Sequence, residues 1–157
     1  MHIINYIQAK EVFENSRKRK LANNTYLEKD SIGDFYAVRL HSTRIICYYP
    51  NRTVLNTGGW KTLTTKERMN EFTPFTIWQE QGIWYIANRT SEGCNKNTAL
   101  VFEDGCFYSY KSDTWQNCGE NPKAMLKLRK KVRQYAKGFA KAFFEGLIPS
   151  KDISSGI

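Results

Sequence analysis

The fold is decided by the stretch at residues 35–49, which reads FYAVRLHSTRIICYY. Apolar and polar residues alternate along it with the period of two that is typical of half-buried strands. Val38 and Leu40 fall on one face of the first run, whereas Arg39 and His41 share the other face. The stretch is therefore predicted to form two strands, with Val38 and Leu40 in the core.

Similar short runs, rich in aromatic and β-branched residues, extend on both sides of this stretch. We predict strands at residues 25–29, 35–41, 44–49, 53–57, 75–79, 83–88, 98–103 and 106–110. Turn residues separate them at Gly33-Asp34, Pro50-Asn51, Gln81-Gly82 and Asp104-Gly105. The last pair is a strong signal for a type I′ hairpin. Because hairpin-length links dominate, we expect an antiparallel sheet built as a meander of hairpins.

Helical patterns lie at both ends of the chain and once in the middle. Residues 1–21 are predicted to form a short amphipathic helix that ends in a basic run of Arg17, Lys18, Arg19 and Lys20. The spacing of Thr64 and Glu67 is that of a capping box, which predicts a short helix beginning at Thr65. We expect an α+β fold in which terminal helices flank the sheet, with one domain over residues 1–150 and a loose tail at residues 151–157.

The clearest helical signal is near the C-terminus. Asn121 suits the N-cap, Pro122 the first helical position, and Gly146 the residue after the helix end. Apolar residues recur every three or four positions, which predicts a face that packs on the core: Met125, Leu128, Val132, Tyr135, Phe139 and Phe143. A row of lysines repeats at the same spacing about half a turn away: Lys123, Lys127, Lys130, Lys137 and Lys141.

Charge is segregated along the chain. The 157 residues carry a net charge of +9, of which residues 1–24 contribute +3 and residues 123–145 contribute +7. The remainder is nearly neutral, at −1. No apolar run approaches the roughly 20 residues needed to cross a bilayer, and the N-terminus has no pattern of a secretion signal. We expect a protein of the cytoplasm with no transmembrane segment.

Three interpretations of the basic C-terminal helix remain open: a solvated face, a surface for nucleic acid or another polyanion, and a surface for an anionic membrane. Solvated faces usually mix charge signs, but no acid lies between Asn121 and Phe144. This favours a polyanion, either DNA or RNA, or an acidic protein surface. The candidate nucleic-acid-binding residues are Lys123, Lys127, Lys130, Lys131, Arg133, Lys137, Lys141, Arg17, Lys18, Arg19 and Lys20.

A second candidate site lies in the neutral middle. Residues 55–70 place a Gly-Gly turn before the predicted central helix, beside lysines and threonines. Such a turn can form an anion site with backbone N–H groups, although it can equally be a plain strand-to-helix turn. The candidate anion-site residues are Arg39, His41, Thr43, Gly58, Gly59, Lys61, Thr64, Thr65, Lys66 and Arg68.

Catalytic and metal signatures are weak. Cys47, Cys94, Cys106 and Cys118 lack a short chelating spacing, so we expect reduced thiols and neither a metal nor a cofactor. His2 and His41 are the histidines of the chain, and no known hydrolase or metalloprotease motif is present. A non-enzymatic protein is favoured, and a small nuclease or phosphate-handling enzyme is the weaker alternative.

Several strings in the chain resemble a group of small proteins encoded by bacteriophages and phage-like elements. The resemblance is carried by RLHST at residues 39–43 and by GGWKTLTTKERMN at residues 58–70, and it extends over most of the chain. It implies a phage setting, in which small basic proteins handle nucleic acid or disarm a host defence. We therefore expect a nucleic-acid or polyanion binder, with an inhibitor of a host defence system, such as an anti-CRISPR, as the alternative.

Overall fold

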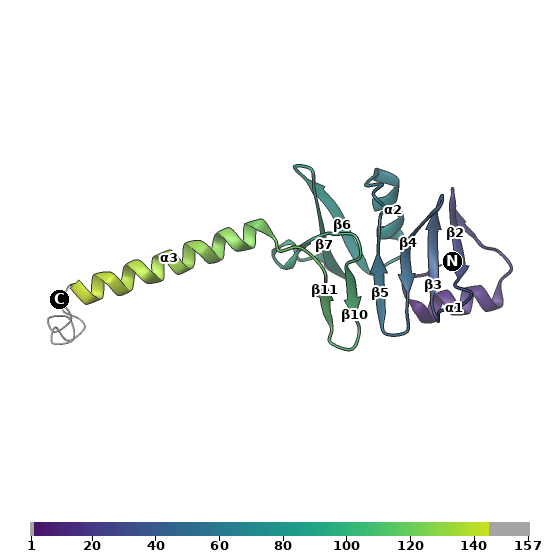
Figure 1. Ribbon diagram of the computed structural model, residues 1–157, viewed down its shortest axis with the longest axis horizontal. Coiled ribbons are helices and arrows are strands. Elements are labelled where there is room, and N and C mark those ends of the chain that lie inside the picture. The colour runs from purple at the N-terminus through teal and green to yellow at the C-terminus, as the bar shows by residue number, and fades with distance from the viewer. Residues whose placement is uncertain (1, 145–157) are drawn as a thin grey trace. The chain divides into compact units, whose positions relative to one another are not determined.

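The computed structural model describes residues 2–144, in two units that are each considered by itself (Figure 1). The first unit ends at Gly119 and contains all of the strands and the first two helices. The second contains helix α3, Pro122–Phe144. The single domain expected over residues 1–150 stays a prediction, and the expected tail at residues 151–157 lies outside the described residues.

Two antiparallel sheets form the first unit, which confirms the predicted α+β class (Figure 1). The larger sheet contains, in spatial order, β1 (Lys20–Ala22), β2 (Thr25–Lys29), β3 (Tyr36–Leu40), β4 (Thr43–Tyr48), β5 (Arg52–Leu55), β10 (Phe107–Ser109) and β11 (Thr114–Gln116). In the smaller sheet, β7 (Ile83–Thr90) pairs with β6 (Phe75–Glu80), β8 (Gly93–Cys94) and β9 (Leu100–Val101). A short 3₁₀ helix at Lys96–Thr98 precedes β9.

The hairpin predicted around Asp104-Gly105 is wrong. Instead of pairing with each other, β9 pairs with β7 and β10 pairs with β5, so this turn carries the chain from one sheet to the other. Gly105 adopts a φ of +86°, but Asp104 has no positive φ, so the turn is also not the predicted type I′, which needs a positive φ at both central residues. The local sequence therefore indicates a turn at this point, but it determines neither the turn type nor the strands that the turn connects.

The N-terminal helix is shorter than predicted. Helix α1 covers Tyr6–Asn15, and the Asn5 side chain caps it by accepting a hydrogen bond of 2.9 Å from the Gln8 N–H. The basic run therefore lies after the helix, and Lys20 begins β1, an edge strand that the sequence pattern did not reveal.

Helix α2 covers Leu63–Glu71 and begins two residues earlier than predicted. Its N-cap is Thr62, whose hydroxyl accepts a hydrogen bond of 3.2 Å from the Thr65 N–H. The predicted capping residue, Thr64, instead lies in the first turn of the helix. Threonines at neighbouring positions are all suitable caps, which is why the pattern alone misplaced the start.

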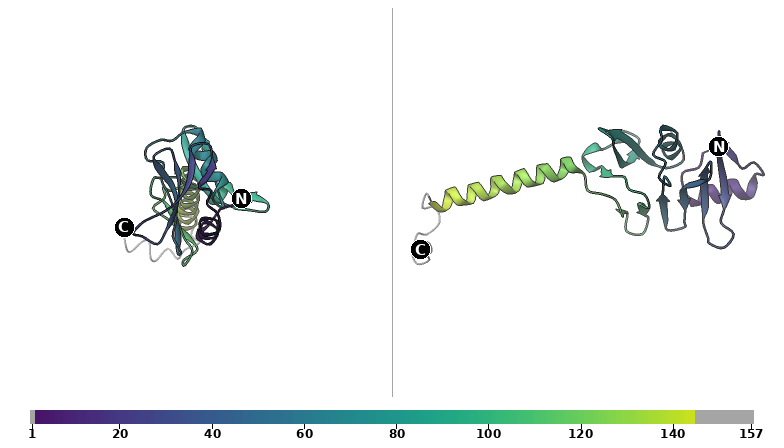
Figure 2. Two further views of the ribbon diagram at one scale, coloured as in Figure 1. Left: turned by 90° about the vertical axis from the view of Figure 1, so that its right-hand side faces the viewer. Right: turned by 45° about the horizontal axis from the view of Figure 1, so that its top comes forward.

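Both helices lie on the same side of the larger sheet (Figure 2). Tyr36 of β3 packs edge-on against Tyr6 of α1, and its cross-strand partner Tyr48 donates a hydrogen bond of 2.5 Å to the Phe72 carbonyl at the end of α2. Directly opposed residues of an antiparallel pair point to the same face. Val38 and Leu40 lie on this face and are buried, as predicted.

Helix α3 begins as predicted. The Asn121 side chain accepts a hydrogen bond of 2.9 Å from the Lys123 N–H, and Pro122 is the first helical residue. Val132 and Tyr135 of the predicted apolar face are exposed, and packing of that face on a core stays a prediction. The end predicted at Gly146 lies outside the described residues.

Among residues 2–144, no helix is both long enough and apolar enough to cross a membrane.

Substitution of Tyr48 tests the attachment of α2 to the sheet. Tyr48→Phe removes the donor and leaves the buried Phe72 carbonyl without its partner, so we expect a loss of about 1–3 kcal/mol in the free energy of unfolding. Tyr6→Phe is the matched control, because the Tyr6 hydroxyl donates to Asp34 at an exposed site. Urea unfolding of both variants measures the difference. Equal losses would contradict a special role for Tyr48.

Candidate functional site

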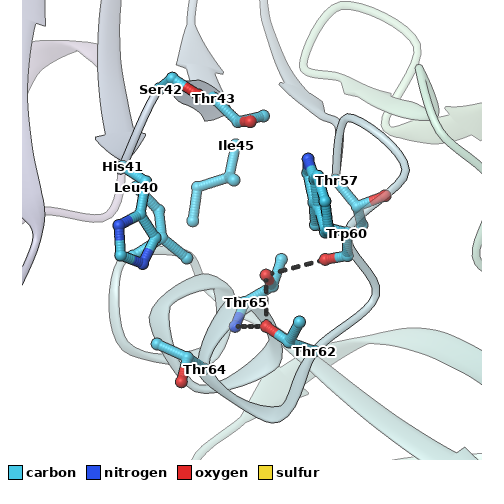
Figure 3. Close-up of a pocket in the computed structure, with 10 residues that line it drawn as sticks. All are labelled: Leu40, His41, Ser42, Thr43, Ile45, Thr57, Trp60, Thr62, Thr64 and Thr65. Atoms are coloured by element: carbon cyan, nitrogen blue, oxygen red, sulfur yellow. Dashed lines mark hydrogen bonds between the residues drawn. The ribbon is translucent and has the colours of Figure 1, made fainter.

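A pocket of about 460 Å³ lies where the β3–β4 turn, the loop after β5 and the first turn of α2 meet (Figure 3). Leu40 and Ile45 supply its apolar side chains, and His41 and Trp60 supply rings. The remaining lining residues all carry hydroxyl groups: Ser42, Thr43, Thr57, Thr62, Thr64 and Thr65. The volume is within the range of small-molecule sites, about 300–1,000 Å³.

The loop at residues 56–62, called here the Gly58 loop, forms one wall of the pocket. Gly58 and Gly59 have φ values of +63° and +89°, which L side chains rarely adopt. A Cβ at Gly58 would also lie 2.8 Å from Cγ2 of Thr43. The Gly-Gly pair therefore serves both a left-handed turn and a close approach to the β3–β4 turn.

Asp104 anchors the Gly58 loop from a distant part of the chain. Its carboxylate accepts hydrogen bonds of 2.7 Å from the Thr57 N–H and of 2.8 Å from the Thr57 hydroxyl. Thr57 is fully buried, so these donors have no access to water. The turn between β9 and β10 thus fixes the start of the loop that carries Trp60.

The N-terminus of α2 fixes the other end of the same loop. The Trp60 carbonyl accepts hydrogen bonds of 3.0 Å from the Thr62 N–H and from the Thr65 hydroxyl (Figure 3). Thr62 in turn caps the helix through Thr65. The backbone of Trp60 is therefore held on both sides, while the residue as a whole is 69% exposed.

The opposite wall is the tight turn at His41 and Ser42 (Figure 3). His41 adopts a φ of +53°, and its N–H donates a hydrogen bond of 2.8 Å to the Asn24 carbonyl. A register shift between Val38 and Arg39 adds an extra residue on β4. Such bulges redirect side chains, and Ile45, at the bulge, lines the pocket between the two walls.

The pocket brings together the polar residues of the predicted anion site, but the lysines and arginines predicted for that site do not line it. His41, Thr43, Thr64 and Thr65 line it, and Gly58 and Gly59 shape its wall. None of the ten described residues that line it is a lysine, an arginine or an acid. His41 is the one imidazole among these ten residues.

The predicted cations have other partners. The Lys66 ammonium donates to the Gln79 side chain at 3.1 Å and lies over the Trp84 ring. Arg68 donates to the Thr25 hydroxyl at 3.0 Å and forms an ion pair with Glu71, the last residue of α2. Lys61 is exposed and lies outside the pocket lining.

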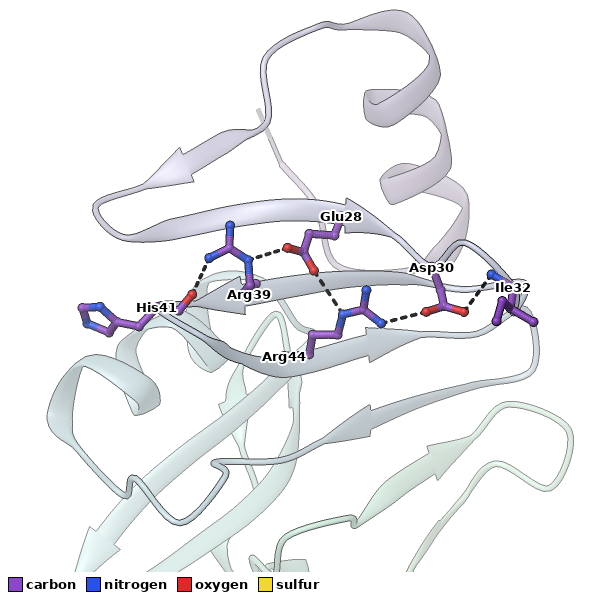
Figure 4. A network of polar contacts seen from close by, with 6 residues as sticks. All are labelled: Glu28, Asp30, Ile32, Arg39, His41 and Arg44. Carbon is purple, nitrogen blue, oxygen red and sulfur yellow. Dashed lines mark hydrogen bonds and ion pairs between the residues drawn. The ribbon is translucent and has the colours of Figure 1, made fainter.

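Arg39 belongs to an ion network on the face of the larger sheet that helices α1 and α2 do not cover (Figure 4). Arg39 and Arg44 are directly paired across β3 and β4, and the Glu28 carboxylate binds both guanidinium groups. Arg44 also contacts Asp30 at 2.9 Å. The acids neutralise two like charges that would otherwise repel each other.

Both acids of this network are held in their charged form. Partial burial alone would raise the pKa of Glu28, but hydrogen bonds from Arg39 and Arg44 hold it below its ordinary value of 4.5. Hydrogen bonds from Arg44 and from the Gly33 N–H lower the pKa of Asp30. The network is therefore complete at neutral pH.

The candidate nucleic-acid-binding residues lie in two places. Arg17 and Lys18 are exposed after α1, and the Arg19 guanidinium stacks on the Phe13 ring at 3.8 Å. On α3 the side chains described as exposed are those of Lys123, Lys130, Lys131, Arg133 and Lys137. The side chains of Lys127 and Lys141 lie outside the described residues.

The four cysteines are free, and two of them are in contact. The interaction of the Cys106 thiol with Cys118, together with burial, raises the pKa of Cys106, and the same interaction lowers the pKa of Cys118. The spacing of twelve residues between these cysteines does not predict this contact, because it does not reveal that the chain reverses direction between them. No group of three or more metal-ligating side chains occurs in the described part of the chain.

Asp104 provides a test of the anchored loop. Asp104→Ala would leave two buried donors of Thr57 unpaired, so we expect the free energy of unfolding to fall by about 1–3 kcal/mol. Asp104→Asn is the matched control, because its amide oxygen retains one acceptor and should recover part of the loss. Chemical denaturation of the three proteins provides the measurement, and an Ala variant as stable as the parent would disprove the anchor.

The ion network predicts a pH dependence. A lowered carboxyl pKa in the folded state adds stability that is present above pH 4.5 and is lost as pH falls through the lowered value. We therefore expect Glu28→Gln to cost about 1–2 kcal/mol at pH 7, and the difference from the parent to shrink in acid. Unfolding titrations from pH 7 to pH 3 measure it. A difference that is constant with pH would contradict an ionic origin.

Sequence comparisons agree with the phage resemblance. A family model described as Kyanoviridae Gp96 protein matches residues 2–114, which include both walls of the pocket and Asp104. No match was found among curated proteins or among solved structures. Because the matched segment is more than half of the chain, the protein belongs to the Kyanoviridae Gp96 protein family of cyanophage-encoded proteins.

Proposed function

We propose that this cyanophage protein binds nucleic acid or another polyanion, without catalysis, through helix α3. The observation that carries the proposal is the composition of the helix. Residues 122–144 contain eight lysines and arginines and no acid. Like charges along one helix repel each other. A helix that carries only basic charges therefore favours a partner that supplies the opposite charge.

The contrast with the rest of the protein supports this choice. Residues 25–119 contain ten basic and ten acidic residues, so this part of the first unit is neutral as a whole. Several of these cations are in ion pairs, as Arg39 and Arg44 are with Glu28. The net charge that is available to a partner therefore belongs to the ends of the chain.

The dimensions of the helix suit a phosphate backbone. Its 23 residues extend over about 35 Å at 1.5 Å per residue. Exposed cations such as Lys130, Lys131 and Lys137 can displace the counterions condensed on a duplex or a single strand. Affinity from this source is largely independent of sequence and decreases steeply as salt is added.

A second candidate is inhibition of a host defence system through an acidic protein or ribonucleoprotein surface. Exposed apolar side chains on the same helix favour it, because a pure polyanion would not cover them. These are Leu126, Val132 and Tyr135, which are 62%, 60% and 78% exposed.

Charge reversal tests the proposal. We expect Lys127, Lys130, Lys137 and Lys141, all changed to Glu, to weaken binding to a fluorescent 20-base-pair duplex by at least about 100-fold at low salt, and to reduce the slope of log K against log salt. Fluorescence anisotropy in a salt series provides the measurement, and circular dichroism checks that the helix content is retained. Single-stranded DNA and RNA are measured in parallel.

The matched control reverses four exposed lysines of the first unit: Lys10, Lys29, Lys61 and Lys111. It changes the net charge equally but leaves α3 intact. Equal weakening by both variants would contradict a helix-specific surface. Capture experiments from host lysate, with and without nuclease, separate the two candidates, because a partner retained after nuclease treatment supports the protein surface.

A further inference from the structure

We propose that the pocket between the β3–β4 turn and the Gly58 loop binds a neutral saccharide. None of the ten described lining residues belongs to α3, and the proposal goes beyond polyanion binding. The proposal rests on a lining without lysine, arginine or acidic side chains, an exposed tryptophan at the wall, hydroxyl groups without partners, and a backbone that is fixed before any ligand arrives (Figure 3).

Trp60 is the first element of the site. Tryptophan is on average a highly buried residue, yet 69% of Trp60 is exposed while its backbone is held by Thr57, Thr62 and Thr65. An indole fixed in this way offers a flat apolar face at a pocket wall. The face of a sugar ring, which carries C–H groups, can stack on such a surface and bury apolar area on both sides.

The hydroxyl groups divide into two sets. Those of Thr57, Thr62 and Thr65 are used to hold the loop and the helix cap. Ser42, Thr43 and Thr64 form no side-chain hydrogen bond to any other residue in the described part of the chain. These three hydroxyl groups are available to a ligand.

The chemistry of these groups selects the ligand class. A serine or threonine hydroxyl can donate one hydrogen bond and accept others, as the hydroxyl groups of a sugar do. A fully deprotonated phosphate group only accepts hydrogen bonds, and it would be favoured by lysines or arginines that the structure places elsewhere, such as Lys66 on Gln79 and Arg39 on Glu28. A neutral ligand with mixed donors and acceptors therefore matches the lining better than a phosphate.

Preorganisation adds to the argument. The Gly58 loop is anchored by Asp104 at one end and by the α2 cap at the other, so little ordering is required when a ligand binds. Leu40 and Ile45 line the pocket between the polar walls and are themselves 6% and 1% exposed. Small-molecule sites commonly combine apolar lining residues with a few convergent polar groups.

The full-length protein is screened by saturation-transfer NMR and then by calorimetry. The probes are neutral trisaccharides of glucose, galactose, mannose and N-acetylglucosamine in α- and β-linked forms, and inorganic phosphate and adenosine form the comparison arms. We expect at least one trisaccharide to bind at up to millimolar concentration, with an affinity that is nearly independent of salt, because the ligand carries no charge.

Variants locate the binding. Trp60→Ala should weaken it by about tenfold, and Thr64→Val, which removes a free hydroxyl, by roughly threefold to tenfold. Tyr135→Ala and Thr76→Val are the matched controls, because Tyr135 is an equally exposed aromatic residue on α3 and Thr76 is a half-buried threonine on β6. Both controls should bind as the parent does.

Three results would overturn the proposal: no binding by any trisaccharide at millimolar concentration, unchanged binding by Trp60→Ala, or tighter binding of phosphate or adenosine than of every saccharide. None of these results affects the nucleic-acid assay on α3, so the two proposals can fail separately.

Discussion

The first unit depends on the pairing of β10 with β5, which joins strands that are distant in sequence. Leu55 donates a hydrogen bond of 3.0 Å to the Cys106 carbonyl, and its own carbonyl accepts one of 2.9 Å from Gly105. Everything between them, including α2 and the smaller sheet, is closed into one long loop, whose entropy cost must be offset by the contacts made inside it. The hydrogen bonds from Thr57 to Asp104 extend this closure. The pocket wall is therefore anchored at the point where the chain returns to pair with β5.

Sequence reasoning succeeded where the determinants are local. Alternation in residues 35–49 identified two strands of the larger sheet, and Asn121 with Pro122 identified the start of α3. It failed where the partner is remote. The strands β1, β8 and β11 have only two or three residues each, too few for an alternating pattern to distinguish them from loops. The change of sheet at Asp104-Gly105 depends on tertiary packing, which no turn signal encodes.

The site was predicted in part for the same reason. The Gly-Gly turn and the threonines before α2 are contiguous, so their grouping in one wall was foreseeable, and His41 joins them through a tight turn. The fate of the cations was not foreseeable. Arg39 pairs with Glu28 because β2 lies beside β3, a neighbour relation that appears only in the folded sheet. The threonines on both sides of Trp60 are the sequence signal that groups this residue with the pocket wall.

The contact between Gly58 and Thr43 has a consequence for how the family can evolve. Added bulk at position 58 would meet the Thr43 side chain, and the positive φ of Gly58 disfavours any replacement. A substitution at one of these two positions is therefore tolerated only with a suitable residue at the other, although the positions are fifteen apart in the sequence. Natural variants should retain glycine at 58 and a small residue at 43 as a linked pair, even in lineages whose surface charge has diverged.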